Sequence, residues 1–300
     1  MPTDVHQHIW PARLIALLRA RTAAPRLDGW TLHLDGEPPY DVAPADHDTA
    51  ARAALAAADG LDLALVSLSS PLGIELLPPD EADELLAAYH DGVHDLPPPF
   101  GAWAAASLTR PDPAALTREL ARGAYGLQLP ANALVDEAGW RATGPLLEAL
   151  EAAGKPLFVH PGPAAPAPPG APSWWPALVP YVTQMHASWH AFRAFGRARH
   201  PRLRVCFALL AGLAPLHGER LAARSAAAER DRGAIDPQVF YETSSYGTRA
   251  VDAMLRTTGI DALCAGSDRP YAEPVHPDLG DAAALHALRT TNPARLLNGA

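Results

Sequence analysis

The sequence has few of the features that mark secreted, membrane-spanning or nucleic-acid-binding proteins. It contains two cysteines, Cys206 and Cys264, and both lie within apolar runs, so no disulfide framework is expected and a reducing compartment fits. No apolar run approaches the roughly 18–20 residues that cross a bilayer. Lysine occurs once, at Lys155, and the formal net charge is −9 without any basic stripe. We therefore expect a cytoplasmic protein with no nucleic-acid partner and no membrane partner.

What the chain does contain is material for a large core. Apolar residues make up 48% of its 300 residues, and short apolar runs alternate with helical stretches along its whole length. The eight expected strands are 3–8, 61–68, 100–107, 124–129, 156–160, 203–209, 239–243 and 261–265. Alternating strands and helices predict a parallel sheet, and eight such units favour a closed (β/α)8 barrel, a TIM-like α/β fold. We expect one domain over residues 1–300, with a hairpin insertion at 30–42, a proline-rich mouth loop at 162–176 and one long helix over 175–198.

Polar side chains end several of these strands, and in such a barrel the strand ends form the active site. His6 and His8 end the first strand, and their i, i+2 spacing lets both imidazoles point into the barrel mouth. His160 ends the fifth strand, and Asp268 follows the eighth. Three imidazoles and one carboxylate suit a divalent metal, Zn²⁺ above all, with water completing its shell.

The same segments resemble a known enzyme superfamily. The chain reads DVHQH at residues 4–8, GSDRP at 266–270 and TNPARLL at 291–297. Together with His160, these segments resemble the amidohydrolase superfamily, and more closely its amidohydrolase-related branch, typified by aminocarboxymuconate-semialdehyde decarboxylase. The resemblance spans residues 4–297. It implies a distorted (β/α)8 barrel whose metal ligands fall at His6, His8, His160 and Asp268.

The resemblance also bears on the number of metal ions. Binuclear members of the superfamily bridge two metals with a carboxylated lysine, usually at the end of the fourth strand. Here that strand ends in Leu127-Gln128-Leu129, and Lys155 precedes the fifth strand at the opposite end of the barrel. A single metal ion is therefore expected.

One position departs from the family pattern. Relatives carry a histidine at the end of the sixth strand that assists proton transfer, whereas this chain has Leu209 there. Losing a general acid–base typically lowers the rate about 10²–10⁴-fold. The candidate replacements are Asp268 itself and the i, i+4 pair His186 and His190 on the long helix, whose first turns would overhang the mouth. The alternative for the pair is packing on the outside of the helix.

Further residues are candidates for contacting the substrate. Trp174 and Trp175 end the mouth loop, Trp10 follows the first strand, Arg269 adjoins the expected ligand Asp268, and Tyr246 lies just beyond the seventh strand. The tryptophans would cover an apolar or planar substrate, and the guanidinium would meet a carboxylate or form a structural ion pair instead.

Three functional hypotheses follow. The first is a mononuclear metal-dependent hydrolase that uses an activated water on an amide, lactone or ester carbonyl, with Asp268 as the base. The second is a metal-dependent, non-oxidative decarboxylase of an unsaturated or aromatic acid. The third is a metal-binding pseudoenzyme, because Leu209 cannot exchange a proton. The expected partner is a small-molecule substrate, and relatives often form homodimers.

Overall fold

The computed structural model describes residues 1–226 and 235–299, and its centre is a ring of parallel strands. Eight strands form two hydrogen-bonded series, β1-β5-β6 and β7-β8-β9-β10-β11. Their bounds are β1 (Thr3–Gln7), β5 (Leu63–Val66), β6 (Phe100–Ala102), β7 (Leu127–Pro130), β8 (Leu157–His160), β9 (Val205–Phe207), β10 (Val239–Glu242) and β11 (Leu263–Cys264). Parallel bridges Ala104–Leu127 and Gln7–Arg269 join the two series at both seams. The predicted (β/α)8 barrel is thereby confirmed, and its strands follow one another around the ring in chain order.

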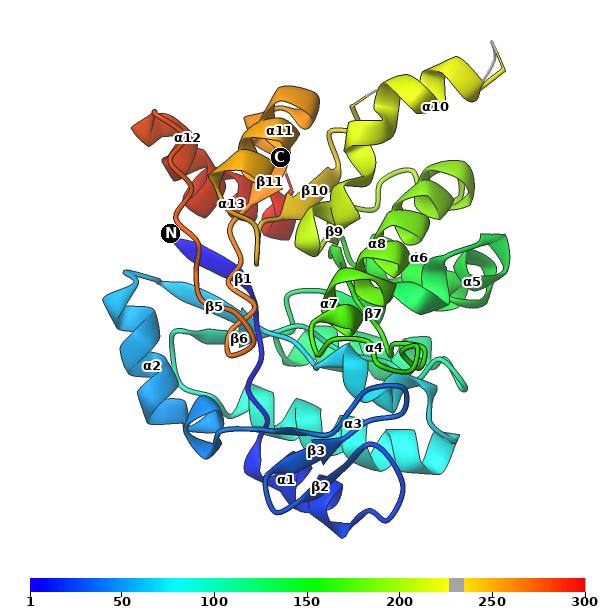
Figure 1. Cartoon of the computed structure of the whole chain (residues 1–300), viewed down its shortest axis with the longest axis vertical. Helices are drawn as coiled ribbons and strands as arrows, with labels where there is room; N and C mark the ends of the chain where they lie inside the picture. Colours follow the sequence, from blue (N-terminus) through cyan, green and yellow to red (C-terminus); the bar gives the residue numbers. More distant parts are fainter. Residues whose placement is uncertain (227–234, 300) are drawn as a thin grey trace.

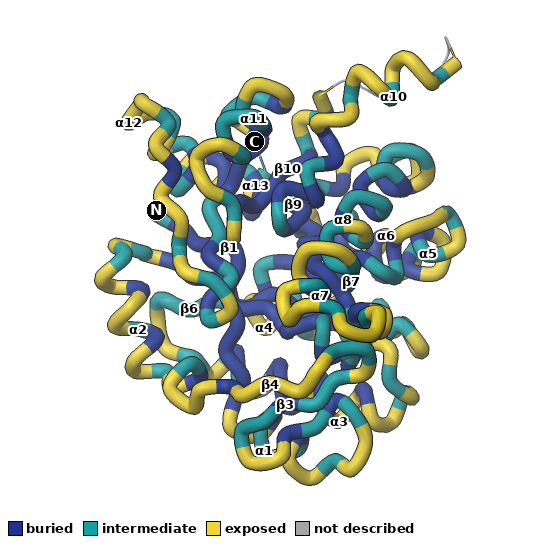
Figure 2. The backbone as a smooth tube through the Cα atoms, in the orientation of Figure 1, coloured by how far each residue is buried: buried dark blue, intermediate teal, exposed yellow. Residues whose placement is uncertain are grey.

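Helices cover the outside of the ring, and the strands form the buried centre (Figures 1 and 2). The longer helices are α1 (Ala12–Ala20), α2 (Thr49–Ala58), α3 (Pro79–His94), α4 (Pro113–Arg122), α6 (Gly144–Ala152), α8 (Pro180–Ala191) and α11 (Thr248–Thr258). The shorter ones are α5 (Glu137–Ala142), α7 (Trp175–Leu178), α9 (Arg197–Arg199), α10 (Gly218–Arg224), α12 (Ala282–His286) and α13 (Asn292–Asn298). Single turns include η1 (Pro44–His47), η2 (Ser70–Leu72), η3 (Ile74–Leu76), η4 (Ala131–Leu134) and η8 (Ile260–Ala262). η6 (Leu209–His217) is a longer, kinked segment, and wider π-type turns are η5 (Phe192–Gly196) and η9 (Ala287–Thr291).

Local sequence signals explain how one of these helices begins and ends. Asp112 precedes α4, and its carboxylate accepts hydrogen bonds from the backbone N–H groups of Ala114 and Ala115. Such a cap is worth about 1 kcal/mol. The helix ends at Gly123, whose φ of 115° lies in the left-handed region that glycine adopts without steric cost. Its buried Leu116 then packs on the barrel wall.

The predicted insertion after the first strand is a small antiparallel sheet. It comprises β2 (Arg26–Asp28), β3 (Thr31–His33) and β4 (Tyr40–Asp41), so it begins four residues earlier than the predicted hairpin. The loop between β3 and β4 approaches the proline-rich loop that follows β8. A Cβ on Gly36 would lie 2.1 Å from the carbonyl oxygen of Ala164, so only glycine fits at this contact. The two predicted mouth segments therefore pack against each other.

The long helix predicted over residues 175–198 is present but kinked. α7 ends at Leu178 and Pro180 starts α8, and between them Val179 is distorted, with φ −109° and ψ −70°, although its N–H still donates to the carbonyl oxygen of Trp175. Proline lacks an N–H and its ring clashes with the preceding turn, which explains the kink. A second irregularity, η5, interrupts the helix after Ala191. Throughout the described ranges, every helix is too short or too polar to cross a membrane.

Candidate metal centre

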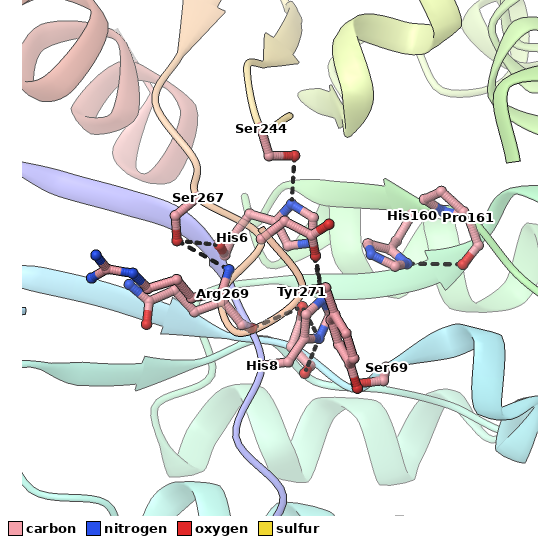
Figure 3. A network of polar contacts seen from close by, with 12 residues as sticks. His6, His8, Ser69, His160, Pro161, Ser244, Ser267, Arg269 and Tyr271 are labelled. Carbon is pink, nitrogen blue, oxygen red and sulfur yellow. Dashed lines mark hydrogen bonds and ion pairs between the residues drawn. The ribbon is translucent and has the colours of Figure 1, made fainter. Parts of the chain in front are cut away.

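Four side chains from three distant strands converge at the carboxyl-terminal end of the barrel. His6 and His8 come from β1 and the residue after it, His160 ends β8, and Asp268 follows β11. One nitrogen or oxygen atom from each lies within 4.8 Å of the corresponding atom of the others. The three imidazole rings have centroids 4.8–5.0 Å apart and stand nearly perpendicular to one another. Figure 3 shows them gathered between the strand ends.

Hydrogen bonds on the outer side of each imidazole fix which nitrogen carries its proton. Nδ1 of His8 lies 3.0 Å from the carbonyl oxygen of Ser67, and Nδ1 of His160 lies 2.8 Å from that of Pro161. A carbonyl oxygen only accepts, so both Nδ1 atoms carry hydrogen and both Nε2 atoms keep a free lone pair. Nδ1 of His6 donates in the same way to the Glu242 carboxylate, at 3.0 Å.

The resulting cluster presents acceptors to its own centre. Nε2 of His6 and Nε2 of His8 lie 3.1 Å apart, and each lies within 3.3 Å of Oδ1 of Asp268. Lone pairs held this close repel one another unless a proton or a cation lies between them. Three imidazole nitrogens and a carboxylate oxygen are the ligands that divalent transition metals prefer. The residues present therefore fit a divalent metal ion.

Charge and burial set the ionisation of these groups. Burial lowers the pKa of His8, and it lowers the pKa of His160 well below its usual range. Burial also lowers the pKa of His6, but the carboxylates of Asp268 and Glu242 outweigh it and the net shift is upward. Burial opposes ionisation of Asp268, yet the imidazoles, His6 first, lower its pKa to about 2. Two neutral imidazoles and an ionised carboxylate are the protonation states that a metal requires.

Glu242, which sequence reasoning missed, is the fully buried partner of His6. It ends β10, and its carboxylate also accepts hydrogen bonds from the hydroxyl of Ser244 at 2.8 Å and from the backbone N–H groups of Ser244 and Leu209. A carboxylate behind a ligating histidine fixes the ring and increases its basicity. The sequence signal that could have identified Glu242 is its position at the end of the seventh strand.

Two buried side chains hold the ends of β1 and β11 together beneath the centre. Asp4 accepts hydrogen bonds from the backbone N–H groups of His6 and Ser267. Arg52 donates to the carbonyl oxygens of His8 and Asp46 and to the side chain of Gln7. Arg52 therefore has a structural role.

Leu209, which follows β9 after Ala208, stands on an unusual turn. Leu209, Leu210, Ala211 and Leu213 all have φ between 49° and 61°, in the left-handed region. Each such non-glycine residue costs about 1–2 kcal/mol, so this backbone is strained. The turn leaves Leu209 lining the cavity above the centre.

A cavity of about 440 Å³ opens onto three of the four residues. His8, His160 and Asp268 line it, whereas His6 lies behind them. The remaining lining residues are mostly apolar, among them Leu34, Pro71, Leu72, Leu178, Val182 and Leu209, and the polar ones include Glu37, Tyr40, Tyr181, Tyr246 and Tyr271. No lysine or arginine is among the lining residues that the structure describes. Tyr246 was predicted, whereas the other three tyrosines and Glu37 were missed because their segments reach the cavity only through the tertiary fold.

Four predicted substrate contacts lie elsewhere and need correction. Trp10 is buried, stacks on His47 and donates to the hydroxyl of Ser69. Trp174 is half exposed, and neither it nor Trp175 lines the cavity. The following residues of α7, Pro176, Ala177 and Leu178, line it instead. Arg269 extends away from the imidazoles (Figure 3) and forms ion pairs with Asp59 and Glu273.

The predicted pair His186 and His190 also lies off the cavity. Their rings are 4.7 Å apart, and His186 contacts His217, 5.1 Å away across the gap to η6. Neither residue of the pair lines the cavity. Because the helix is kinked at Pro180, the residues of α7 reach the cavity, whereas His186 and His190 on α8 lie against η6. Asp268 is the predicted proton-transfer residue that the structure brings to the centre.

Comparison with solved structures supports the fold assignment. An IDCase from Metarhizium anisopliae matches with a TM-score of 0.81 at 18% identity, over 99% of this chain and 97% of that chain. A 5-carboxyvanillate decarboxylase from Novosphingobium aromaticivorans, complexed with manganese and 4-hydroxy-3-methoxy-5-nitrobenzoic acid, matches with a TM-score of 0.74 at 18% identity, over 99% and 96%. An amidohydrolase II matches with a TM-score of 0.74 at 16% identity, over 99% of both chains.

Each of these three structural matches covers 99% of this chain. No family model and no curated protein sequence matches it. The chain therefore has the TIM-barrel fold of the amidohydrolases and of the decarboxylases built on the same barrel, as the sequence resemblance implied.

Proposed function

We propose that the protein is a metal-dependent enzyme that removes the carboxyl group of a small aromatic or unsaturated acid without oxidation. The observation that carries the proposal is a cluster of four metal-binding groups, three of which line a mostly apolar cavity. The named decarboxylases with this fold support it, and one of them holds manganese and a benzoic acid. In this reaction the bond between the ring and the carboxyl carbon breaks, carbon dioxide leaves, and a proton takes its place on the ring carbon.

Each part of the site has a role in that reaction. A divalent cation bound by His6, His8, His160 and Asp268 would supply a Lewis acid for the substrate's anionic oxygens. Metal analysis of the purified protein would distinguish zinc from manganese as the bound cation. The apolar wall holds the ring and keeps water away from the reacting carbon.

Asp268 is the residue we assign to proton transfer. It lines the cavity beside His8 and His160, and no described residue hydrogen-bonds its Oδ2 atom. Glu37, the other carboxylate of the cavity, is hydrogen-bonded to Tyr181 instead. Because Asp268 is ionised at rest, it would act as a relay that takes a proton from solvent and passes it to the ring carbon as the carboxyl group leaves.

Hydrolysis of an amide, lactone or ester is the second candidate. Leu209 favours it, because a site with one proton-transferring residue suffices to take a proton from water and return it to a leaving group. Here too Asp268 would carry the proton.

The two reactions are separable by products. The metal-loaded protein is incubated in D₂O with hydroxybenzoic acids and, separately, with lactones and aryl amides. Decarboxylation gives carbon dioxide and a ring carrying one deuterium at the former carboxyl position, detected by mass spectrometry. Turnover of lactones or amides alone would replace our proposal with hydrolysis. Turnover of neither panel by protein carrying stoichiometric metal would contradict both.

A further inference from the structure

The lining of the cavity contains a second carboxylate, which is held in place between two segments. Glu37 lies in the loop between β3 and β4, and its Oε1 atom accepts a hydrogen bond of 2.5 Å from the hydroxyl of Tyr181 on α8. At Gly36 the same loop packs closely against Ala164 of the proline-rich mouth loop. Glu37 is therefore fixed in the cavity wall rather than free on the surface.

Among the residues that the structure describes, none that lines the cavity with Glu37 carries a permanent positive charge. The described lining residues include no lysine or arginine. The two arginines held near the strand ends are engaged elsewhere: Arg269 pairs with Asp59 and Glu273, and Arg52 binds Gln7 and backbone carbonyls. Burial raises the pKa of Glu37, as expected for a carboxyl group with apolar neighbours such as Leu34, Pro38 and Pro39.

These surroundings discriminate between ligands. A second carboxylate at this end of the cavity would be desolvated beside a like charge with no counter-ion, which is costly. A hydroxyl or an amide N–H would instead donate to Glu37, and hydrogen bonds to a charged acceptor are roughly twice as strong as neutral ones.

We propose that Glu37, positioned by Tyr181, is the specificity-determining residue of the cavity. It selects substrates whose end remote from the metal centre is uncharged and donates a hydrogen bond, such as a phenolic hydroxyl, and it rejects a second carboxylate. The inference rests on the proposed function only for placing the substrate's first carboxylate at the metal centre.

The test measures dissociation constants by calorimetry on the metal-loaded protein. The first ligand pair is 4-hydroxybenzoate and terephthalate, which differ only in the group opposite the first carboxylate. We expect the hydroxy acid to bind at least tenfold more tightly. Glu37→Gln removes the charge with little change of shape, and we expect it to tighten terephthalate binding at least tenfold while the hydroxy acid binds no more tightly than it does to the wild type. Asp35→Asn is the matched control, because Asp35 is exposed on the same loop and lies outside the cavity lining.

A second pair separates this inference from the proposed function. 4-Ethylphenol and its methyl ether carry no carboxylate, and the wild type should prefer the phenol at least fivefold, with a smaller preference in Glu37→Gln. If neither acid binds but the phenol preference holds, the proposed function is wrong and the role of Glu37 stands. If terephthalate binds the wild type as tightly as 4-hydroxybenzoate, or if Glu37→Gln and Asp35→Asn have the same effect, the inference is overturned. If neither acid binds and the wild type binds 4-ethylphenol and its methyl ether equally tightly, the inference is overturned as well.

Discussion

Replacing Glu242 with glutamine tests the hydrogen bond that prepares His6 for a metal. Its Oε2 atom accepts from Nδ1 of His6 at 3.0 Å and from the hydroxyl of Ser244, and its Oε1 atom accepts from the backbone N–H of Ser244. In Glu242→Gln one oxygen becomes an N–H₂ group, which meets a second donor in either orientation: the Nδ1–H of His6 at the Oε2 position, or the backbone N–H of Ser244 at the Oε1 position. Leaving such a buried group unsatisfied costs about 1–3 kcal/mol. At about 1.4 kcal/mol per decade, metal affinity should fall about 5–150-fold.

Competition with a chromogenic chelator measures this loss directly, without any assumption about the substrate. Glu75→Gln is the matched control, because Glu75 is equally buried but hydrogen-bonds Ser70 outside the four-residue cluster. We expect the control to keep wild-type metal affinity. Equal metal affinity in wild type and Glu242→Gln, with both folded by circular dichroism, would refute the reasoning.

Three other predictions follow from single positions. Gly266→Ala should reproduce the loss of metal affinity, because a Cβ at residue 266 would lie 2.2 Å from Oε1 of Glu242, and chelator competition would show it. Burial raises the pKa of Glu75 to about 7 from an ordinary 4.5. The native state therefore holds this proton more tightly than the unfolded state, and its contribution to stability, present below pH 4.5, is lost as the pH rises to about 7. The difference between these two pKa values corresponds to about 3 kcal/mol in the free energy of unfolding. In urea unfolding, Glu75→Gln should gain about that much relative to wild type between pH 4.5 and 8, and a constant difference would count against it. Leu209→His should raise kcat for a hydroxybenzoic acid about 10²-fold by adding a proton-transfer group. A fall in carbon dioxide release would indicate a site built around leucine.

The barrel was predictable because its signals are local. Each strand is a short apolar run bounded by turn residues, and burial on both faces removes any need for alternation. The i, i+2 spacing of His6 and His8 likewise follows from strand geometry alone. The kink in the long helix was missed because an apolar stretch around Pro180 still reads as helical when the proline is taken as a first-turn residue of a longer element.

The cavity wall was less predictable, because aromatic and charged residues on loops carry no periodicity. Trp174 and Trp175 suggested a cover for the substrate, yet α7 lines the cavity with its later residues instead. Arg269 suggested a carboxylate contact, but Asp59, distant in sequence, neutralises it. Only the contacts between segments decide which of two neighbouring side chains faces the cavity.

The sequence by itself determined the order of strands and helices and which side chains end the strands, since both depend on spacing along the chain. The tertiary structure alone decided that Glu242 stands behind His6, that all three imidazoles turn their free nitrogens inward, and that Glu37 joins the cavity lining beside Tyr181. The physical reason is that protonation and selectivity depend on distances of a few ångströms between groups far apart in the chain, and those distances arise only when the barrel closes.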